Sequence, residues 1–512
     1  MFRQPEDRRA GLAAALLLAA AWAVLPAAPA LWRGEIVGSP FTDLYPSVWG
    51  LAWFAAHQPG LPVHTDWLGA PEGMRFYFSS PLHGWLGTPL WRLGGPAFAY
   101  DATLLAARFA TVAVAFGCFR AAGLGVAGGL AAAGVYGASP FFQGYAAEGI
   151  VEGTDGWTLP LWAWIVLRAP RADGRGVPLA RRAAHLVAAA VAFAAVIVSS
   201  WYLGMVACLL ALGWGPFRRE AWASAGLGLL LATPFVALFV DSMSGATPLP
   251  DAIRAAMGAP LGVRRPGIAP ELNPFAINTW IGVSTFVLAA LSARERPLFA
   301  LGALSCAVLS LGRGPWYDLP VLQSVRFPYR WHAGTLFCLA PLVGATVDRL
   351  GRRWLAVLPV IEGFLLSPVE PVLPGAPADV PGIYDLVRGP VLLEVPGPVA
   401  MPPGEINRSR PRARYLLHHQ LFHGAASPWA PDFNGVADVA QAPWLASFAS
   451  WDPLVATSPV PPDVAAARAA GVVQVMVHRE ELRANADPFE VALQEAGAVK
   501  EAEDGDRVLY RL

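Results

Sequence analysis

The hydrophobic positions of this sequence run in long unbroken stretches and do not alternate with polar ones. Stretches close to the length of a membrane-crossing helix fall at residues 11–32, 101–119, 123–140, 157–168, 183–199, 200–217, 221–240, 277–292, 298–312, 331–348 and 354–367. They predict about eleven transmembrane helices. The first stretch exceeds the apolar core of a signal peptide and more spans follow it, so we interpret it as an uncleaved first span.

The arginines predict how these spans are oriented. With the N-terminus in the cytoplasm, the short inner segments carry sixteen arginines, whereas the much longer outer segments carry nine. This bias follows the positive-inside rule. It places the long loop 33–100, the shorter outer loops and the C-terminal tail outside the cytoplasm, which in a bacterial inner membrane is the periplasmic or extracellular side.

Composition supports this class of protein. Of the 512 residues, 55% are hydrophobic and 14% charged, with a mean hydropathy of +0.44, which is typical of a polytopic membrane protein. Residues 369–512 carry 11 basic and 18 acidic side chains. We therefore predict two domains, a transmembrane domain at 1–368 and an extracytoplasmic domain at 369–512. The single lysine and the scattered arginines indicate no nucleic-acid partner, and the cysteines lie in apolar stretches without disulfide or zinc spacing.

The tail mixes extended and helical patterns. Strands are predicted at 391–395, 472–477 and 507–512, and helices at 414–422, 462–471 and 487–497. This pattern indicates a small α/β domain. His418, His419 and His423 cluster in its first helix at spacings that suit a metal, but we expect them to be solvated surface side chains.

Two aromatic-rich segments of the first outer loop have helical spacing. One covers residues 44–54 and the other residues 89–93. We interpret both as helices lying flat in the headgroup layer. The alternative is a helix pair that only caps the bundle.

Acidic residues of the outer loops are the first candidates for chemistry. Asp43 precedes the helix at 44–54, where it would act as a general base or cap that helix. Glu148, Glu152 and Asp155 lie in the second outer loop without a basic residue among them. They would bind sugar hydroxyls or a divalent metal, or else belong to an ordinary solvated loop.

Arginines are the second group of candidates. Arg313, Arg326 and Arg330 lie in the segment 311–332, and the last two are flanked by aromatic residues at the start of a span. Guanidinium groups there suit a lipid phosphate, with interfacial snorkelling as the alternative. Arg108 lies near the middle of the second span, where it needs a partner from another helix or a lipid phosphate.

No nucleotide-binding, hydrolase or metalloprotease motif is present. A long first outer loop with an early acid, many short-looped spans and an outer soluble tail resemble the GT-C class of membrane glycosyltransferases. The segments TDWLGAPEGMRFYF, GGPAFAYDATLL, LGRGPWYDLPVLQSVRFPYRW, VLLEVPG and AAGVVQVMVHREE are similar to recurring features of a large group of bacterial multi-spanning proteins.

The resemblance implies transfer of a sugar, with inversion, from a polyprenyl-phosphate carrier to an acceptor on the outer face. It implies Asp43 as the catalytic base. Beside it, we expect Arg313, Arg326 and Arg330 on the donor phosphate, and Asp66, Glu148, Glu152 and Asp155 near the substrate. The acid at residue 43 is not part of a paired acidic motif, so the sequence identifies no particular metal or other cofactor. A transporter or lipid flippase, and a non-catalytic envelope scaffold, remain the alternative functions.

Overall fold

The protein is described by a computed structural model that covers residues 5–61, 63–169, 178–242, 280–319, 322, 325, 327–367, 369–397, 410–429, 442–455 and 458–512. Its contacts divide the chain into two compact units. The helical unit comprises Met1–Gly38, Ser79–Ala237 and Pro248–Ala376, and the C-terminal unit comprises Ser39–Phe78, Leu238–Thr247 and Pro377–Leu512. The first outer loop is thus shared between them, and the division at residues 368–369 stays a prediction.

Each of the eleven apolar stretches contains a helix among its described residues. These are α1 (Pro5–Val24) with α2 (Ala28–Trp32), α4 (Pro81–Ala121), α5 (Val126–Gly137), α8 (Thr158–Arg168), α9 (Leu179–Ser199), α10 (Trp201–Trp214), α11 (Arg219–Ser242), α13 (Val283–Ser292), α14 (Pro297–Leu309), α16 (His332–Leu350) and α17 (Leu358–Leu366). Among the described residues, the helical segments at Pro81–Ala121, Leu179–Ser199, Arg219–Asp241 and Pro328–Leu350 are long and apolar enough to cross a membrane. A count of eleven spans stays a prediction.

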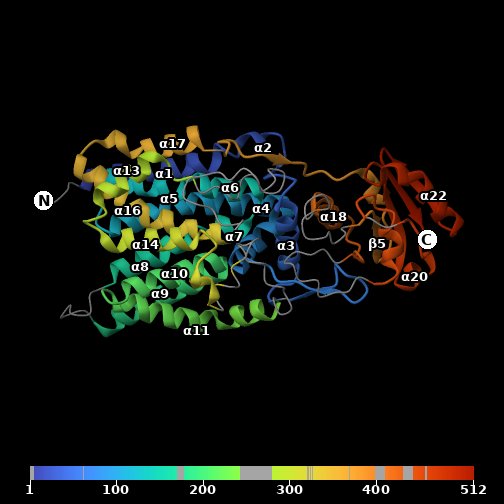
Figure 1. Ribbon diagram of the computed structural model, residues 1–512, viewed down its shortest axis with the longest axis horizontal. Helices are drawn as coiled ribbons and strands as arrows, with labels where there is room; N and C mark the ends of the chain where they lie inside the picture. The colour runs from blue at the N-terminus through green and yellow to red at the C-terminus, as the bar shows by residue number, and fades with distance from the viewer. Residues whose placement is uncertain are drawn as a thin grey trace. The chain divides into compact units, whose positions relative to one another are not determined.

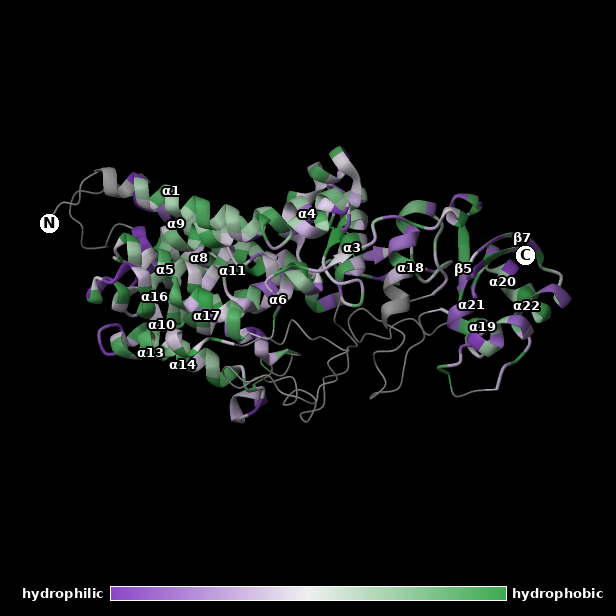
Figure 2. Ribbon diagram, turned by 90° about the horizontal axis from the view of Figure 1, so that it is seen from above, coloured by the Kyte–Doolittle hydropathy of each residue, from purple (hydrophilic) through white to green (hydrophobic). Residues whose placement is uncertain are grey.

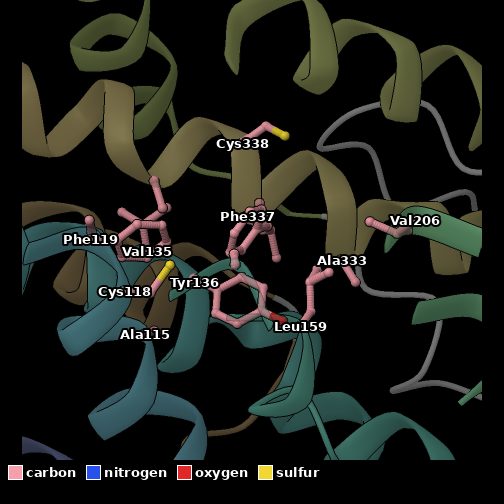
Figure 3. Close-up of a cluster of buried hydrophobic side chains, with 14 of the residues drawn as sticks. Ala115, Cys118, Phe119, Val135, Tyr136, Leu159, Val206, Ala333, Phe337 and Cys338 are labelled. Carbon is pink, nitrogen blue, oxygen red and sulfur yellow. The ribbon is translucent and has the colours of Figure 1, made fainter. Parts of the chain in front are cut away.

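The helices pack side by side into a bundle, in which α16 contacts α5, α13 and α14 (Figure 1). Hydrophobic residues dominate these helices (Figure 2). Close packing at their centre comes from Phe337 of α16, which meets Phe119 of α4 and Tyr136 of α5 (Figure 3). Bilayer-length apolar helices with a close-packed centre make this unit an integral membrane bundle.

Helix α4 is broken at Gly95, whose φ of 79° lies in the left-handed region. His83 and Thr103 are twenty residues apart, yet Thr103 Oγ1 lies 2.8 Å from His83 Nε2. A straight helix would separate them by about 30 Å. The segment before Gly95 therefore folds back against the segment after it.

Two short helices, α6 (Pro140–Glu148) and α7 (Val151–Thr154), fill the second outer loop. The 3₁₀ turns η1 (Pro315–Asp318) and η2 (Pro328–Trp331) follow α14, and η3 (Arg353–Ala356) precedes α17. Strands β1 (Ile36–Val37) and β4 (Gly375–Ala376) pair antiparallel.

The C-terminal unit contains a four-stranded sheet in the order β5 (Val391–Val395), β6 (Val472–His478), β8 (Arg507–Arg511) and β7 (Val499–Asp504). β5 pairs parallel with β6, and the other pairs are antiparallel. Three strands were predicted and β7 was not. Around the sheet lie η4 (Gly382–Leu386), α18 (Arg410–His423), α19 (Leu445–Ala449), α20 (Val464–Ala469), α21 (Arg479–Leu482), η5 (Arg483–Asn485) and α22 (Ala486–Glu495).

The predicted helix at 44–54 is α3 (Leu44–Ala56) and packs on α18 within the C-terminal unit, next to the hairpin of β2 (His64–Thr65) and β3 (Met74–Arg75). Trp49 and Trp53 are fully buried, and Trp49 Nε1 donates a hydrogen bond to Gln420 Oε1 at 2.7 Å. The expectation that these aromatics meet lipid headgroups is therefore wrong. The second predicted helix, at 89–93, is the first segment of α4, and its position in the headgroup layer stays a prediction.

Candidate functional site

The best-defined polar site of the helical unit is built around Arg330, at the end of η2. Its side chain is 7% exposed, and its Nη1 donates a hydrogen bond to Oε1 of Glu152 on α7. The guanidinium carbon lies 4.4 Å from the ring centre of Tyr202, 4.7 Å from that of Phe327 and 5.7 Å from that of Tyr145. Arg330 thus joins a carboxylate and several aromatic faces.

Tyr145, Tyr202, Glu152 and Arg330 line a small pocket, open on one side, with a cavity volume of about 10 Å³. Its wall consists of Phe141, Phe142, Tyr145, Glu152, Gly153, Ser200, Tyr202, Leu203, Arg330 and Ala333. The arginine, the carboxylate and the aromatic rings gather around this small opening, and such side chains contact phosphate oxygens and hydroxyl groups of a ligand. The second outer loop and the segment before α16 therefore meet at Glu152 and Arg330.

Asp155 anchors the loop that carries Glu152. Its carboxylate is fully buried and accepts hydrogen bonds from Ser80 Oγ at 3.1 Å and Trp157 Nε1 at 3.3 Å. One of its oxygens lies 3.6 Å from Nδ1 of His83, which contacts Thr103 through its other nitrogen. This buried chain ties both segments of α4 to the start of α8. His83 was not predicted, because nothing in its local sequence indicates a carboxylate partner 72 positions away.

Glu148 and Gly153 complete the loop. Glu148 ends α6 with a fully buried side chain. A Cβ at Gly153 would lie 2.0 Å from Cδ1 of Tyr145, so glycine is required for α7 to approach that ring. The three acids of this loop differ in their surroundings. Glu148 and Asp155 are fully buried, whereas Glu152 lines the pocket around Arg330.

The remaining arginine candidates differ in position. Arg313 is exposed and does not line the pocket around Arg330. Arg326 lies outside the described residues. Arg108 is buried, and its Nη2 donates to Gln143 Oε1 at 2.8 Å and to the Trp22 carbonyl at 2.9 Å. The expected partner from another helix is confirmed, and it is neutral.

Asp43 and Asp66 belong to the C-terminal unit. Asp43 occupies the N-cap position of α3, and its carbonyl accepts from Ser47 N, but its carboxylate makes no capping hydrogen bond. The capping explanation for this acid is therefore wrong. Asp66 is exposed and lies between β2 and β3.

The tail histidines are not solvated, so that expectation was wrong. His418 and His419 are 2% and 5% exposed, and His419 Nδ1 lies 2.9 Å from the Tyr384 hydroxyl. That hydroxyl donates to Oε1 of the buried Glu394 at 2.6 Å. Burial lowers the pKa of His418 to about 4. Among the residues that the structure describes, no three His, Cys, Asp or Glu side chains are grouped to hold a metal ion.

No known family profile and no curated protein sequence matches this chain. Solved structures do, at low identity. The arabinofuranosyltransferase AftD from Mycobacteria has a TM-score of 0.61 at 16% identity over 98% of this chain, which spans 40% of AftD. ArnT from Cupriavidus metallidurans, bound to undecaprenyl phosphate, has a TM-score of 0.54 at 13% identity over 99% of this chain and 98% of ArnT.

The archaeal oligosaccharyltransferase AglB from Archaeoglobus fulgidus, in complex with an inhibitory peptide and a dolichol-phosphate, is also similar. Its TM-score is 0.52 at 11% identity over 98% of this chain and 74% of AglB. These neighbours are GT-C glycosyltransferases. The protein has their fold, in agreement with the resemblance noted in the sequence.

Proposed function

We propose that this protein is an integral membrane glycosyltransferase that takes its sugar from a polyprenyl-phosphate carrier. The observation that carries the proposal is the buried Arg330 in an aromatic pocket, within a fold shared with ArnT, whose structure holds undecaprenyl phosphate. The proposal includes the eleven-span topology, with the N-terminus in the cytoplasm of a bacterial inner membrane and transfer on the outer face.

Arg330 is assigned to the donor phosphate. A guanidinium offers forked donors to phosphate oxygens, and burial beside aromatic rings removes competing water. Arg313 is exposed and Arg326 lies outside the described residues, so their roles in phosphate binding rest on the sequence alone.

The sugar is assigned to the aromatic and acidic wall of the same pocket. Tyr145 and Tyr202 offer ring faces, and Glu152 offers a carboxylate that accepts sugar hydroxyls. Asp155 and Glu148 are buried, and their role is to hold the loop that carries Glu152 in place. A direct role of Asp66 in substrate binding rests on the sequence resemblance alone.

Asp43 is assigned as the base. In the reaction, the acceptor oxygen attacks the anomeric carbon and gives its proton to the Asp43 carboxylate. The bond between that carbon and the phosphate oxygen breaks, and its electron pair leaves with the phosphate. The products are the glycosylated acceptor and polyprenyl phosphate. Support comes from the early outer-loop position and from a carboxylate not used for capping.

Binding of undecaprenyl phosphate to the purified protein tests the phosphate assignment. Arg330→Ala should weaken binding about 10- to 100-fold, since a charge-assisted hydrogen bond is worth about 1.5–3 kcal/mol. Arg330→Lys should recover only part, because an ammonium cannot form the fork. Arg349→Ala, which removes an exposed arginine paired with Glu295, is the control. Equal affinity of Arg330→Ala and wild type would refute the assignment.

A further inference from the structure

The pocket that holds Arg330 also holds a negative charge. Glu152 and Arg330 are ion-paired inside it, with side chains 16% and 7% exposed. An anion that binds the guanidinium therefore meets the Glu152 carboxylate at the same time. The net charge that the pocket offers to a ligand is zero and not plus one.

Neither partner is free to move away. Rings of Tyr202 and Phe327 lie within 5 Å of the Arg330 guanidinium carbon and confine it. Glu152 lies on the single turn α7, and Asp155, directly after that turn, is bound to Ser80 and Trp157. Because neighbouring side chains hold Arg330 and Glu152 in place, a ligand that binds the Arg330 guanidinium also lies close to the Glu152 carboxylate.

The charge of the ligand changes during the proposed reaction, on which this inference rests. The donor is a phosphodiester with one negative charge. Cleavage of the bond to the sugar leaves the electron pair on the phosphate oxygen, so the product is a phosphomonoester. At pH 7 a phosphomonoester carries a charge of about −1.5 to −2. Repulsion by a nearby carboxylate grows in proportion to the ligand's charge.

We propose that Glu152 sets the charge selectivity of this pocket, because it cancels the preference that Arg330 alone would give the doubly charged phosphomonoester product over the singly charged phosphodiester donor. Arg330 attracts the product more strongly than the donor, and Glu152 repels the product more strongly than the donor, so the pair together removes the product's advantage. The ion pair thus weakens product binding at the step where polyprenyl phosphate must leave. Glu152 is a specificity-determining residue for the phosphate as well as a ligand for the sugar.

Two probes that differ in one charge test the proposal. They are undecaprenyl phosphate, a monoester, and its methyl ester, a phosphodiester with the same chain. Dissociation constants for both are measured with the full-length protein in nanodiscs of neutral phosphatidylcholine. The variants are Glu152→Gln, which keeps the shape and removes the charge, Arg330→Ala, and the control Glu295→Gln. Glu295 pairs with Arg349 at an exposed site, where both side chains are at least 42% exposed.

Glu152→Gln should bind the monoester about tenfold more tightly than wild type and the diester about threefold more tightly. Arg330→Ala should weaken both, and Glu295→Gln should change neither. Because Glu152→Gln removes the ion pair of a buried arginine, its melting temperature is measured with and without the monoester. A larger increase on ligand binding than in wild type is expected.

The outcomes separate this inference from the function on which it rests. If wild type binds both lipids through Arg330 but Glu152→Gln shifts both constants equally, or weakens the monoester, charge selectivity is refuted and the phosphate assignment stands. If neither lipid binds wild type or Glu152→Gln, the proposed function itself fails and this inference with it.

Discussion

At the scale of single residues, the environment of Arg330 decides what the pocket can bind. Sequence alone pointed to Arg330 because it lies among aromatic residues at the start of a span. Its partner could not be predicted, because Glu152 lies 178 positions away and no local pattern pairs the two. The same limit applies to His83 and Asp155, which meet only because α4 reverses at Gly95.

Asp43→Asn tests the base. Turnover should fall about 100-fold or more, the usual contribution of a general base, while undecaprenyl phosphate still binds. An amide cannot accept the acceptor's proton. Since asparagine has nearly the same size and shape as aspartate, the melting temperature should stay close to that of wild type. Rates are measured under single-turnover conditions, and transfer at the wild-type rate would rule out Asp43 as the base.

At the scale of elements, hydropathy predicted a helix within each apolar stretch, because a long apolar segment buried in a bilayer or in protein must satisfy its backbone hydrogen bonds within itself. It missed β7, whose sequence VKEAED is exposed at nearly every position. As an edge strand, β7 carries charges that prevent pairing with other chains, so it lacks the alternation by which strands are recognised. The histidines of α18 were mispredicted because their burial depends on Tyr384 and the sheet.

The approach of α6 to α7 gives a prediction at this scale. Gly153→Ala should destabilise the protein by about 1–3 kcal/mol, because the new methyl group overlaps the Tyr145 ring. It should also weaken undecaprenyl phosphate binding, since Tyr145 and Glu152 share the pocket. Thermal unfolding and lipid binding are measured together. Gly213→Ala on α10, where a Cβ meets nothing within 4 Å, is the matched control. Equal effects of the two substitutions would contradict the packing argument.

At the scale of the whole molecule, the two units differ in what stabilises them. The helical unit is an apolar bundle, whereas the C-terminal unit surrounds a mixed sheet with buried polar contacts such as Tyr384 with Glu394. Hydropathy and charge predicted this contrast between an apolar helical domain and an acidic α/β domain. The assignment of residues 39–78 to the C-terminal unit was not foreseen, because it depends on contacts such as Trp49 with Gln420, far apart in sequence.

Acid should destabilise the C-terminal unit. Burial holds the pKa of His418 near 4, below its ordinary 6.5, so the unfolded form binds more protons between these values. The contribution of His418 to the free energy of unfolding is fully present above pH 6.5. It falls by about 3 kcal/mol as the pH drops toward 4. Hydrogen exchange of α18 in the full chain, corrected for intrinsic rates, should increase at pH 4.5. His418→Gln should reduce the increase, and unchanged protection at both pH values would disprove this account.

The most direct measurement of the central claim is sugar transfer itself. Purified protein is incubated with a panel of radiolabelled polyprenyl-phosphate sugars, and the release of free polyprenyl phosphate is followed for wild type and Arg330→Ala. We expect wild type to release the lipid from at least one donor and Arg330→Ala to release it far more slowly. Release from no donor, or equal release by both proteins, would contradict the claim.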